Sequence, residues 1–106
     1  MKKQIVIDKN AEKELGKLNQ EVQLKFQGYF EALEEEGKLD FSDARKISKN
    51  LFEIRVKLKG QYRGFYAYVQ EDYIIILHVF HKKTQKTPFR NIETAERRLI
   101  KYGQDT

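Results

Sequence analysis

Alternating apolar and polar residues predict a run of three β-strands in the second half of the chain. Over residues 51–59, Phe52, Ile54, Val56 and Leu58 fall on one face and the charged residues between them on the other. Residues 62–69 are apolar or aromatic on both faces and residues 73–81 are almost continuously apolar, which is typical of central strands. The short connections at 60–61 and 71–72 predict antiparallel pairing. An alternating segment at 2–8 predicts a further strand at an edge.

Apolar residues at three- and four-residue steps predict helices before and after these strands. The first stripe comprises Ala11, Leu15, Leu18, Val22, Phe26, Phe30 and Leu33. Asn19 interrupts it, which predicts two helices, 10–18 and 20–36, packed as a hairpin. Asp8 or Asn10 is the expected cap at the start, and Gly37 the expected cap at the end.

A second apolar stripe predicts a C-terminal helix. Thr87 is its expected cap and Pro88 its first residue, because proline lacks the N–H that is unpaired there anyway. Its apolar face carries Ile92, Ala95, Leu99 and Tyr102, Gly103 ends it, and Arg97, Arg98 and Lys101 are expected to point elsewhere. Residues 37–50 are expected to form a polar connection that packs in part. The fold class is therefore α+β: an N-terminal helical hairpin packed on a twisted, mostly antiparallel β-sheet with a C-terminal helix.

Length and composition limit what this fold can do. A chain of 106 residues is expected to form a single domain, 1–106. It has no cysteine, which excludes disulfides and thiol chemistry, and with two histidines it is not expected to need a metal or a cofactor. No apolar run reaches the roughly 20 residues that span a bilayer, and Asp8 breaks the N-terminal apolar segment too early for a signal peptide. A cytoplasmic protein without a membrane partner is the expectation.

Charge is unevenly distributed along the chain. Residues 1–43 hold ten acidic and seven basic side chains, whereas residues 44–106 hold six acidic and fourteen basic ones. This asymmetry favours a surface that binds a polyanion such as RNA. The alternative is an ordinary solvated face, since many basic domains bind no nucleic acid.

The strand pattern places several of these cations on one face of the sheet. Arg55 and Arg63 are expected to meet there, with Lys82 at the end of the last strand, and could stabilise the charge of a phosphodiester under attack by a 2′-OH. His78, His81 and Glu53 are the candidates for proton transfer. The expected RNA-binding residues around them are Lys57, Lys59, Lys83, Gln85, Lys86 and Tyr66. By itself, the apolar segment around His78 favours a hydrogen-bonded core position over a catalytic one, and Glu53 is also compatible with an ion pair to Arg55 or to a lysine across the strand.

These residues resemble the RelE/ParE superfamily of bacterial toxins. The segment LFEIR at 51–55 is similar to a signature of the HigB-like, phage-derived branch, and so is Tyr62-Arg63 with Tyr66. The segment at 78–88 matches its pattern H-x-F-x-K-K-T-Q-K-T-P, and Glu93, Ala95, Arg98 and Leu99 match its last helix. The family's C-terminal catalytic tyrosine has no matching position.

The resemblance implies the toxin of a type II toxin–antitoxin system, a ribosome-dependent endoribonuclease (mRNA interferase) that inhibits translation by cutting mRNA in the ribosomal A site. It implies a small antitoxin partner, HigA-like with a helix-turn-helix domain, and binding to operator DNA only through that complex. Arg55 and Arg63 match basic residues at the scissile phosphate, and Lys82 or Lys83 a later basic residue. Two alternatives stay open: a ParE-like poison of DNA gyrase, and an inactive module that binds antitoxin or nucleic acid.

Overall fold

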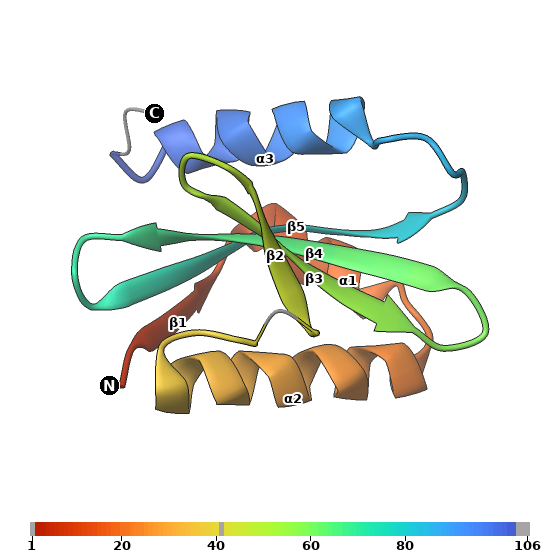
Figure 1. Cartoon of the computed structure of the whole chain (residues 1–106), viewed down its shortest axis with the longest axis horizontal. Helices are drawn as coiled ribbons and strands as arrows, with labels where there is room; N and C mark the ends of the chain where they lie inside the picture. The colour runs from red at the N-terminus through yellow and green to blue at the C-terminus, as the bar shows by residue number, and fades with distance from the viewer. Residues whose placement is uncertain (1, 41, 104–106) are drawn as a thin grey trace.

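Eight elements follow one another in the computed structural model of the chain, which describes residues 2–40 and 42–103 (Figure 1). They are β1 (Gln4–Ile7), α1 (Lys9–Gly16), α2 (Gln20–Glu36), β2 (Ala44–Ser48), β3 (Leu51–Lys57), β4 (Gln61–Val69), β5 (Tyr73–Lys82) and α3 (Phe89–Ile100). The strands form one sheet, with α2 below it and α3 above it in Figure 1. This α+β arrangement confirms the fold class predicted from the sequence.

The sheet has the strand order β1-β5-β4-β3-β2. β1 pairs parallel to β5 at one edge, and every other pair is antiparallel. The edge position of β1 and the antiparallel β3-β4-β5 meander are as predicted. β2 was not predicted. The segment 37–50 was expected to be a connection, but it contains this strand, which pairs with β3.

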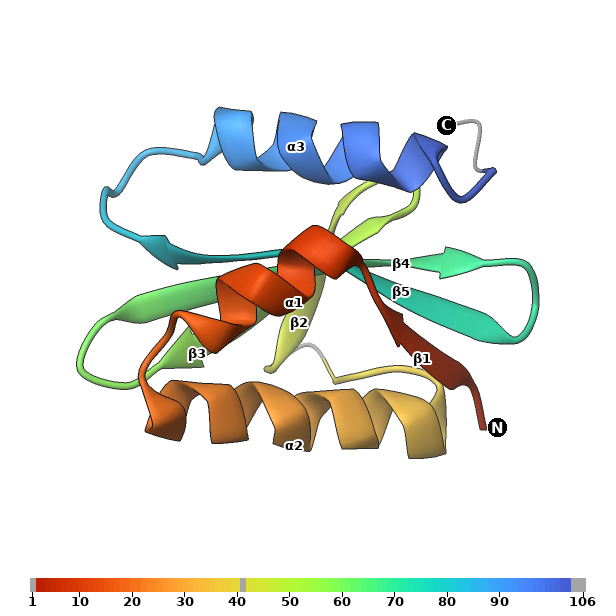
Figure 2. The ribbon, with the colours of Figure 1, turned by 180° about the vertical axis from the view of Figure 1, so that it is seen from behind.

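The lower face of the sheet packs against α2 in one apolar core. Ile54 and Val56 of β3 lie in this core with Phe26 and Phe30 of α2. α2 approaches so closely that a Cβ atom on Gly64 of β4 would lie 2.9 Å from the Phe26 ring. Figure 2 shows α1 crossing the edge of the sheet near β5, between the levels of α2 and α3.

The upper face is only partly covered. Ala95 and Leu99 of α3 pack against Leu51, Phe65 and Leu77 in a second apolar core. Beyond this core, where β3 and β4 approach their connecting turn, Arg55 and Lys57 are exposed. The uncovered part of the sheet is therefore the part that carries the predicted cations.

Local hydrogen bonds fix where the helices begin and end. The Asp8 carboxylate accepts from two N–H groups of the first turn of α1, Asn19 caps α2, and Gly37 ends α2 with φ 78°. α3 differs from the prediction because Pro88 occupies the cap position, no side chain caps the helix, and Thr87 does not serve as its cap. No helix in the described part of the chain is long and apolar enough to cross a bilayer.

Candidate nucleic-acid interface

Three arginines converge on one buried carboxylate at the uncovered part of the sheet. The Glu53 side chain is 2% exposed, and its Oε1 atom lies 3.2 Å from Arg55 Nε and 3.3 Å from Arg45 Nε. Its Oε2 atom lies 3.4 Å from Arg63 Nε. The antiparallel register explains the convergence, because Glu53 pairs with Arg45 on β2 and Arg55 pairs with Arg63 on β4. The site therefore has two more positive than negative charges.

Arg63 is the fixed member of the three. Its side chain is 10% exposed, and its terminal nitrogens donate to the Tyr62 carbonyl and to Gln61 Oε1. Burial lowers the pKa of Arg63 below its ordinary value, Glu53 opposes this effect, and Arg55 and Arg45 add to it. The guanidinium nevertheless stays charged, because an arginine does not lose its proton in proteins.

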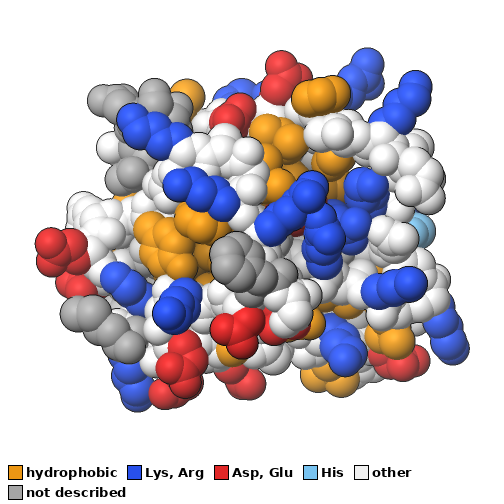
Figure 3. Space-filling view, viewed as in Figure 1, with side chains coloured by type: hydrophobic (Ala, Val, Ile, Leu, Met, Phe, Trp, Pro, Cys, Tyr) orange, Lys and Arg blue, Asp and Glu red, His pale blue; other side chains and the backbone are white. Residues whose placement is uncertain are grey.

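Arg45 and Arg55 both contact Oε1 of Glu53, and both face solvent. Their side chains are 57% and 46% exposed. Figure 3 shows Lys and Arg side chains gathered over the sheet beside an apolar patch. Arg45 was missed by sequence reasoning because β2 was missed. The signal was present in the two-residue connection Lys49-Asn50, since asparagine favours the tight turns of β-hairpins.

The end of β5 and the loop after it continue this basic surface. Phe80 and Lys82 of β5 pair with Arg63 and Gln61 of β4. Lys82 Nζ donates to the Thr84 carbonyl, and a pocket of about 390 Å³ lies here, lined by Gly60, Gln61, His81, Lys82, Lys83, Thr84 and Gln85. Lys86 is exposed in the same loop. The structure thus brings the predicted basic loop to the edge of the arginine site.

His78 belongs to a different, enclosed polar group. It is 7% exposed, with Nδ1 2.9 Å from Glu14 Oε1 and Nε2 2.6 Å from Asn91 Oδ1. Arg98 donates to both Glu14 oxygens and to the Leu77 carbonyl, so it points into the molecule and not away from it as the helical pattern suggested. Burial opposes ionisation of Glu14, but the bonds from His78 and Arg98 outweigh it and lower its pKa to about 2. This group joins α1, β5 and α3.

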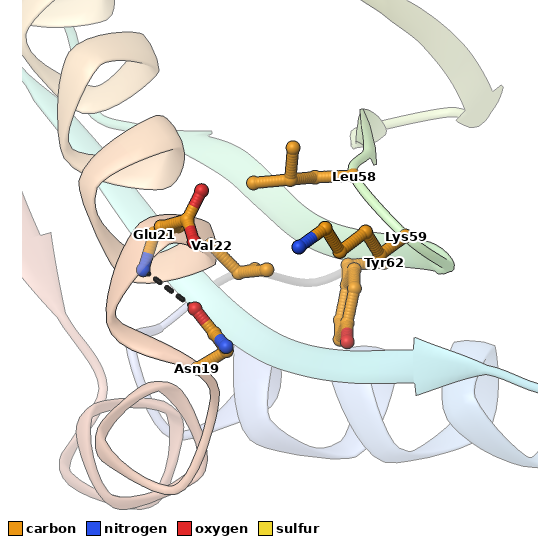
Figure 4. Close-up of a pocket in the computed structure, with 6 residues that line it drawn as sticks. All are labelled: Asn19, Glu21, Val22, Leu58, Lys59 and Tyr62. Carbon is orange, nitrogen blue, oxygen red and sulfur yellow. Dashed lines mark hydrogen bonds between the residues drawn. The ribbon is translucent and has the colours of Figure 1, made fainter.

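Three predicted residues lie away from the arginines. Tyr66 is 2% exposed on the α2 side of the sheet and stacks on Phe52, so its predicted role as an RNA-binding residue is corrected to a core position. His81 stacks on Tyr62 with ring centroids 4.6 Å apart, and it faces away from Arg63, as strand alternation predicted. Lys59 lines a small pocket with Tyr62 and the start of α2 (Figure 4).

No group of three or more His, Asp or Glu side chains within 2–40 and 42–103 is arranged to hold a metal ion. Guanidinium groups bind phosphate oxygens through paired hydrogen bonds. The nearby lysines and the half-buried ring of Phe80 suit a single-stranded polynucleotide.

The fold is that of the RelE toxins. A double mutant of E. coli RelE in the free state superposes with a TM-score of 0.72 at 17% identity, covering 93% of this chain and 99% of that one. RelE of the RelB–RelE complex from Methanococcus jannaschii gives a TM-score of 0.60 at 25% identity, covering 72% and 88%. The RelE–RelB complex from Pyrococcus horikoshii OT3 gives 0.60 at 25%, covering 76% and 96%. A search of curated protein sequences gave no significant match.

A match to a sequence family assigns the chain more narrowly than its fold does. Residues 13–100 match the model of the phage-derived protein Gp49-like family (DUF891), and the chain belongs to that family. Together with the fold, this match confirms the predicted membership of the RelE/ParE superfamily. The HigB-like branch stays a prediction.

Proposed function

We propose that this protein is the toxin of a toxin–antitoxin pair and that it cleaves mRNA on the ribosome. The observation that carries the proposal is the convergence of Arg45, Arg55 and Arg63 on Glu53 at an open part of the sheet. In the reaction, the 2′-oxygen forms a bond to phosphorus, the bond from phosphorus to the 5′-oxygen breaks, and a 2′,3′-cyclic phosphate results. The arginines stabilise the extra negative charge of the intermediate phosphorane.

The proton transfers need groups within reach of that phosphate. Of the three predicted candidates, His78 has partners on both ring nitrogens and Glu53 has partners on both oxygens, whereas His81 is exposed beside Lys82. We therefore propose that the end of β5 supplies the proton transfers: Lys82 beside the arginine site, and His81 from the opposite face of the strand, where the chain leaves the sheet. An imidazole titrates close to neutral pH and serves as base or acid.

We infer that the partner is an antitoxin. Two of the structural neighbours are RelE chains in complexes with RelB. A HigA-like antitoxin with a helix-turn-helix domain, encoded next to this gene, is the proposed partner, and binding of operator DNA is proposed only for the complex. Such a reading frame directly beside the gene is the cheapest supporting observation.

Tightly controlled expression with mapping of mRNA 5′ ends tests the nuclease. We expect growth arrest with new ends inside translated reading frames. Arg55→Ala, Arg63→Ala and Lys82→Ala should each weaken killing, and Arg63→Ala should be among the variants with the largest loss. Arg97 is an exposed arginine of α3, so Arg97→Ala is the control and should kill like the wild type. Circular dichroism must show that Arg63→Ala is folded, because it leaves a buried carboxylate with one cation fewer.

Three outcomes would contradict the proposal. Growth arrest with intact mRNA and continued translation would exclude a translation-blocking nuclease, and induction of the DNA-damage response would point to gyrase. If the triple variant Arg55→Ala, Arg63→Ala, Lys82→Ala still kills, the active site does not lie on this face of the sheet.

A further inference from the structure

The ion pairs around Glu53 suggest a role different from proton transfer. All three arginines approach it with the same atom, Nε, and both of its oxygens are used. We propose that Glu53 is a positioning residue that holds three guanidinium groups together as one phosphate-binding site, and that Arg45 on β2 is the third phosphate-binding side chain. This inference rests on the proposed function for its substrate, the phosphodiester of RNA.

The use of Nε leaves the two terminal nitrogens of Arg45 and of Arg55 available for a phosphate. An arginine carries five N–H donors, four of them on the two terminal nitrogens. Within the described part of the chain, the terminal nitrogens of Arg45 and Arg55 have no recorded hydrogen bond, whereas those of Arg63 donate to Tyr62 and Gln61. Arg63 is thus the buried and fixed member of the site, and Arg45 and Arg55 present terminal N–H donors to solvent.

Burial makes the carboxylate and the arginines depend on one another. A carboxylate that is 2% exposed needs paired cations, because an unpaired buried charge is strongly destabilising. Three cations in contact with one carboxylate repel one another and would separate without it. Glu53 therefore holds Arg45 and Arg55 in place before any phosphate arrives, which saves the cost of ordering two long side chains on binding.

The charge of the cluster suits the transition state better than the ground state. Three guanidinium groups and one carboxylate leave an excess of two positive charges. A phosphodiester carries one negative charge, whereas the phosphorane formed by 2′-oxygen attack carries up to two. Stabilisation that is stronger in the transition state than in the bound substrate accelerates the reaction.

Binding of inorganic phosphate tests the positioning role without any nuclease assay. In the wild-type protein, the ¹⁵N resonances of the Arg45, Arg55 and Arg63 Nε–H groups should be protected from solvent exchange, and those of Arg45 and Arg55 should shift on titration with phosphate. Glu53→Gln removes a negative charge, so charge alone predicts tighter phosphate binding. Positioning predicts the opposite: loss of the protected resonances and about 10-fold weaker binding. Unchanged or tighter phosphate binding would overturn the proposal.

Cleavage kinetics test Arg45. Arg45→Ala should lower kcat about 10- to 100-fold with a smaller effect on KM, because the lost contact is strongest to the phosphorane, and Arg45→Lys should restore part of the rate. Arg97→Ala removes the same charge from the exposed face of α3 and should leave both constants unchanged. Equal kinetics for Arg45→Ala and Arg97→Ala would remove Arg45 from the site. Because Arg45 is half exposed, this variant stays testable even if Glu53→Gln does not fold.

The two proposals fail in different ways. Phosphate-dependent shifts at the three arginines without any cleavage would overturn the nuclease and leave the positioning role intact. Cleavage that Glu53→Gln slows strongly but does not abolish, with unchanged phosphate affinity and the acidic limb of the remaining pH–rate profile lost, would make Glu53 a general base. That result would overturn the positioning role while leaving the nuclease intact.

Discussion

At the residue scale, Glu14 shows how a surface-facing helix position becomes part of the interior. Its carboxylate accepts hydrogen bonds from His78 on β5, from Arg98 on α3 and from the Val79 backbone N–H. These bonds are formed to the ionised carboxylate, so they lower its pKa to about 2 against the cost of its partial burial. His78, a candidate catalyst in the sequence, thereby acts in the attachment of α1 and α3 to the sheet.

The lowered pKa predicts a pH-dependent contribution to stability. The folded protein holds Glu14 ionised down to a pKa of about 2, against an ordinary value of 4.5, so its contribution is complete above about pH 5 and is lost as pH falls toward 2. Glu14→Gln should lower the free energy of unfolding at pH 7 by roughly 2–3 kcal/mol. Urea titrations of both proteins from pH 7 to pH 2 should show this difference narrowing.

A matched variant separates this effect from a general loss of acidic charge. Glu31 is exposed on α2, and Glu31→Gln should leave the free energy of unfolding within about 0.5 kcal/mol of wild type at every pH. A difference between Glu14→Gln and wild type that is the same at pH 7 and pH 2 would show that packing, and not ionisation, is responsible.

At the element scale, the approach of α2 to the sheet depends on a glycine. Gly64 lies on β4 directly above Phe26 of α2, which is fully buried and cannot move aside without disturbing the core. The absent side chain lets the helix and the strand meet at van der Waals distance. This requirement cannot be predicted from the sequence, because a glycine within a strand is compatible with several explanations.

Gly64→Ala should therefore destabilise the fold by about 1–3 kcal/mol in urea titration, as overpacking does in other cores. Adding Phe26→Leu should recover part of this loss, giving a favourable coupling between the two changes. Gly28→Ala on α2 is the control, since nothing lies within 4 Å of its added Cβ, and it should stabilise the helix by about 0.5–1 kcal/mol. Equal effects of the two alanines would contradict the steric explanation.

At the scale of the whole molecule, charge is divided between the two sides of the sheet. α2 ends in three consecutive glutamates, whereas the three arginines and the lysine-rich loop lie at the other face and at the end of β5. A polyanion is therefore attracted to one face and repelled from the other. For the proposed RNA substrate, this arrangement favours a single orientation on the protein.

Salt dependence of RNA binding measures how many of these cations contact phosphate. For a short single-stranded oligonucleotide made uncleavable by 2′-deoxyribose, the logarithm of the affinity should fall linearly with the logarithm of salt concentration, with a slope of about −0.7 per contact. Arg45→Ala and Arg55→Ala should each reduce the slope by about 0.7 in fluorescence anisotropy titrations. Lys25 is an exposed residue of α2, so Lys25→Ala should leave the slope unchanged. Equal slopes for all three variants would show that the RNA binds away from Arg45 and Arg55.

The sequence by itself determined the elements that a local period can encode. Alternation defined β3, β4 and the facing of Arg55 and Arg63, and the helical stripe with Asn19 and Gly37 defined α2. Residues 78–88 indicated the superfamily through the order of their side chains alone. These features depend on neighbours a few residues apart, so they can be read without the fold.

Only the tertiary structure decided which side chains meet. Arg45 and Glu53 became partners because β2 pairs with β3, and His78 left the site because α1 and α3 bring Glu14 and Asn91 to its ring. Tyr66 turned to the α2 core, although its sequence motif suggested a ligand contact. The physical reason is common to all three: burial and ion pairing depend on residues far away in the chain, and no local pattern of apolar and polar positions records them.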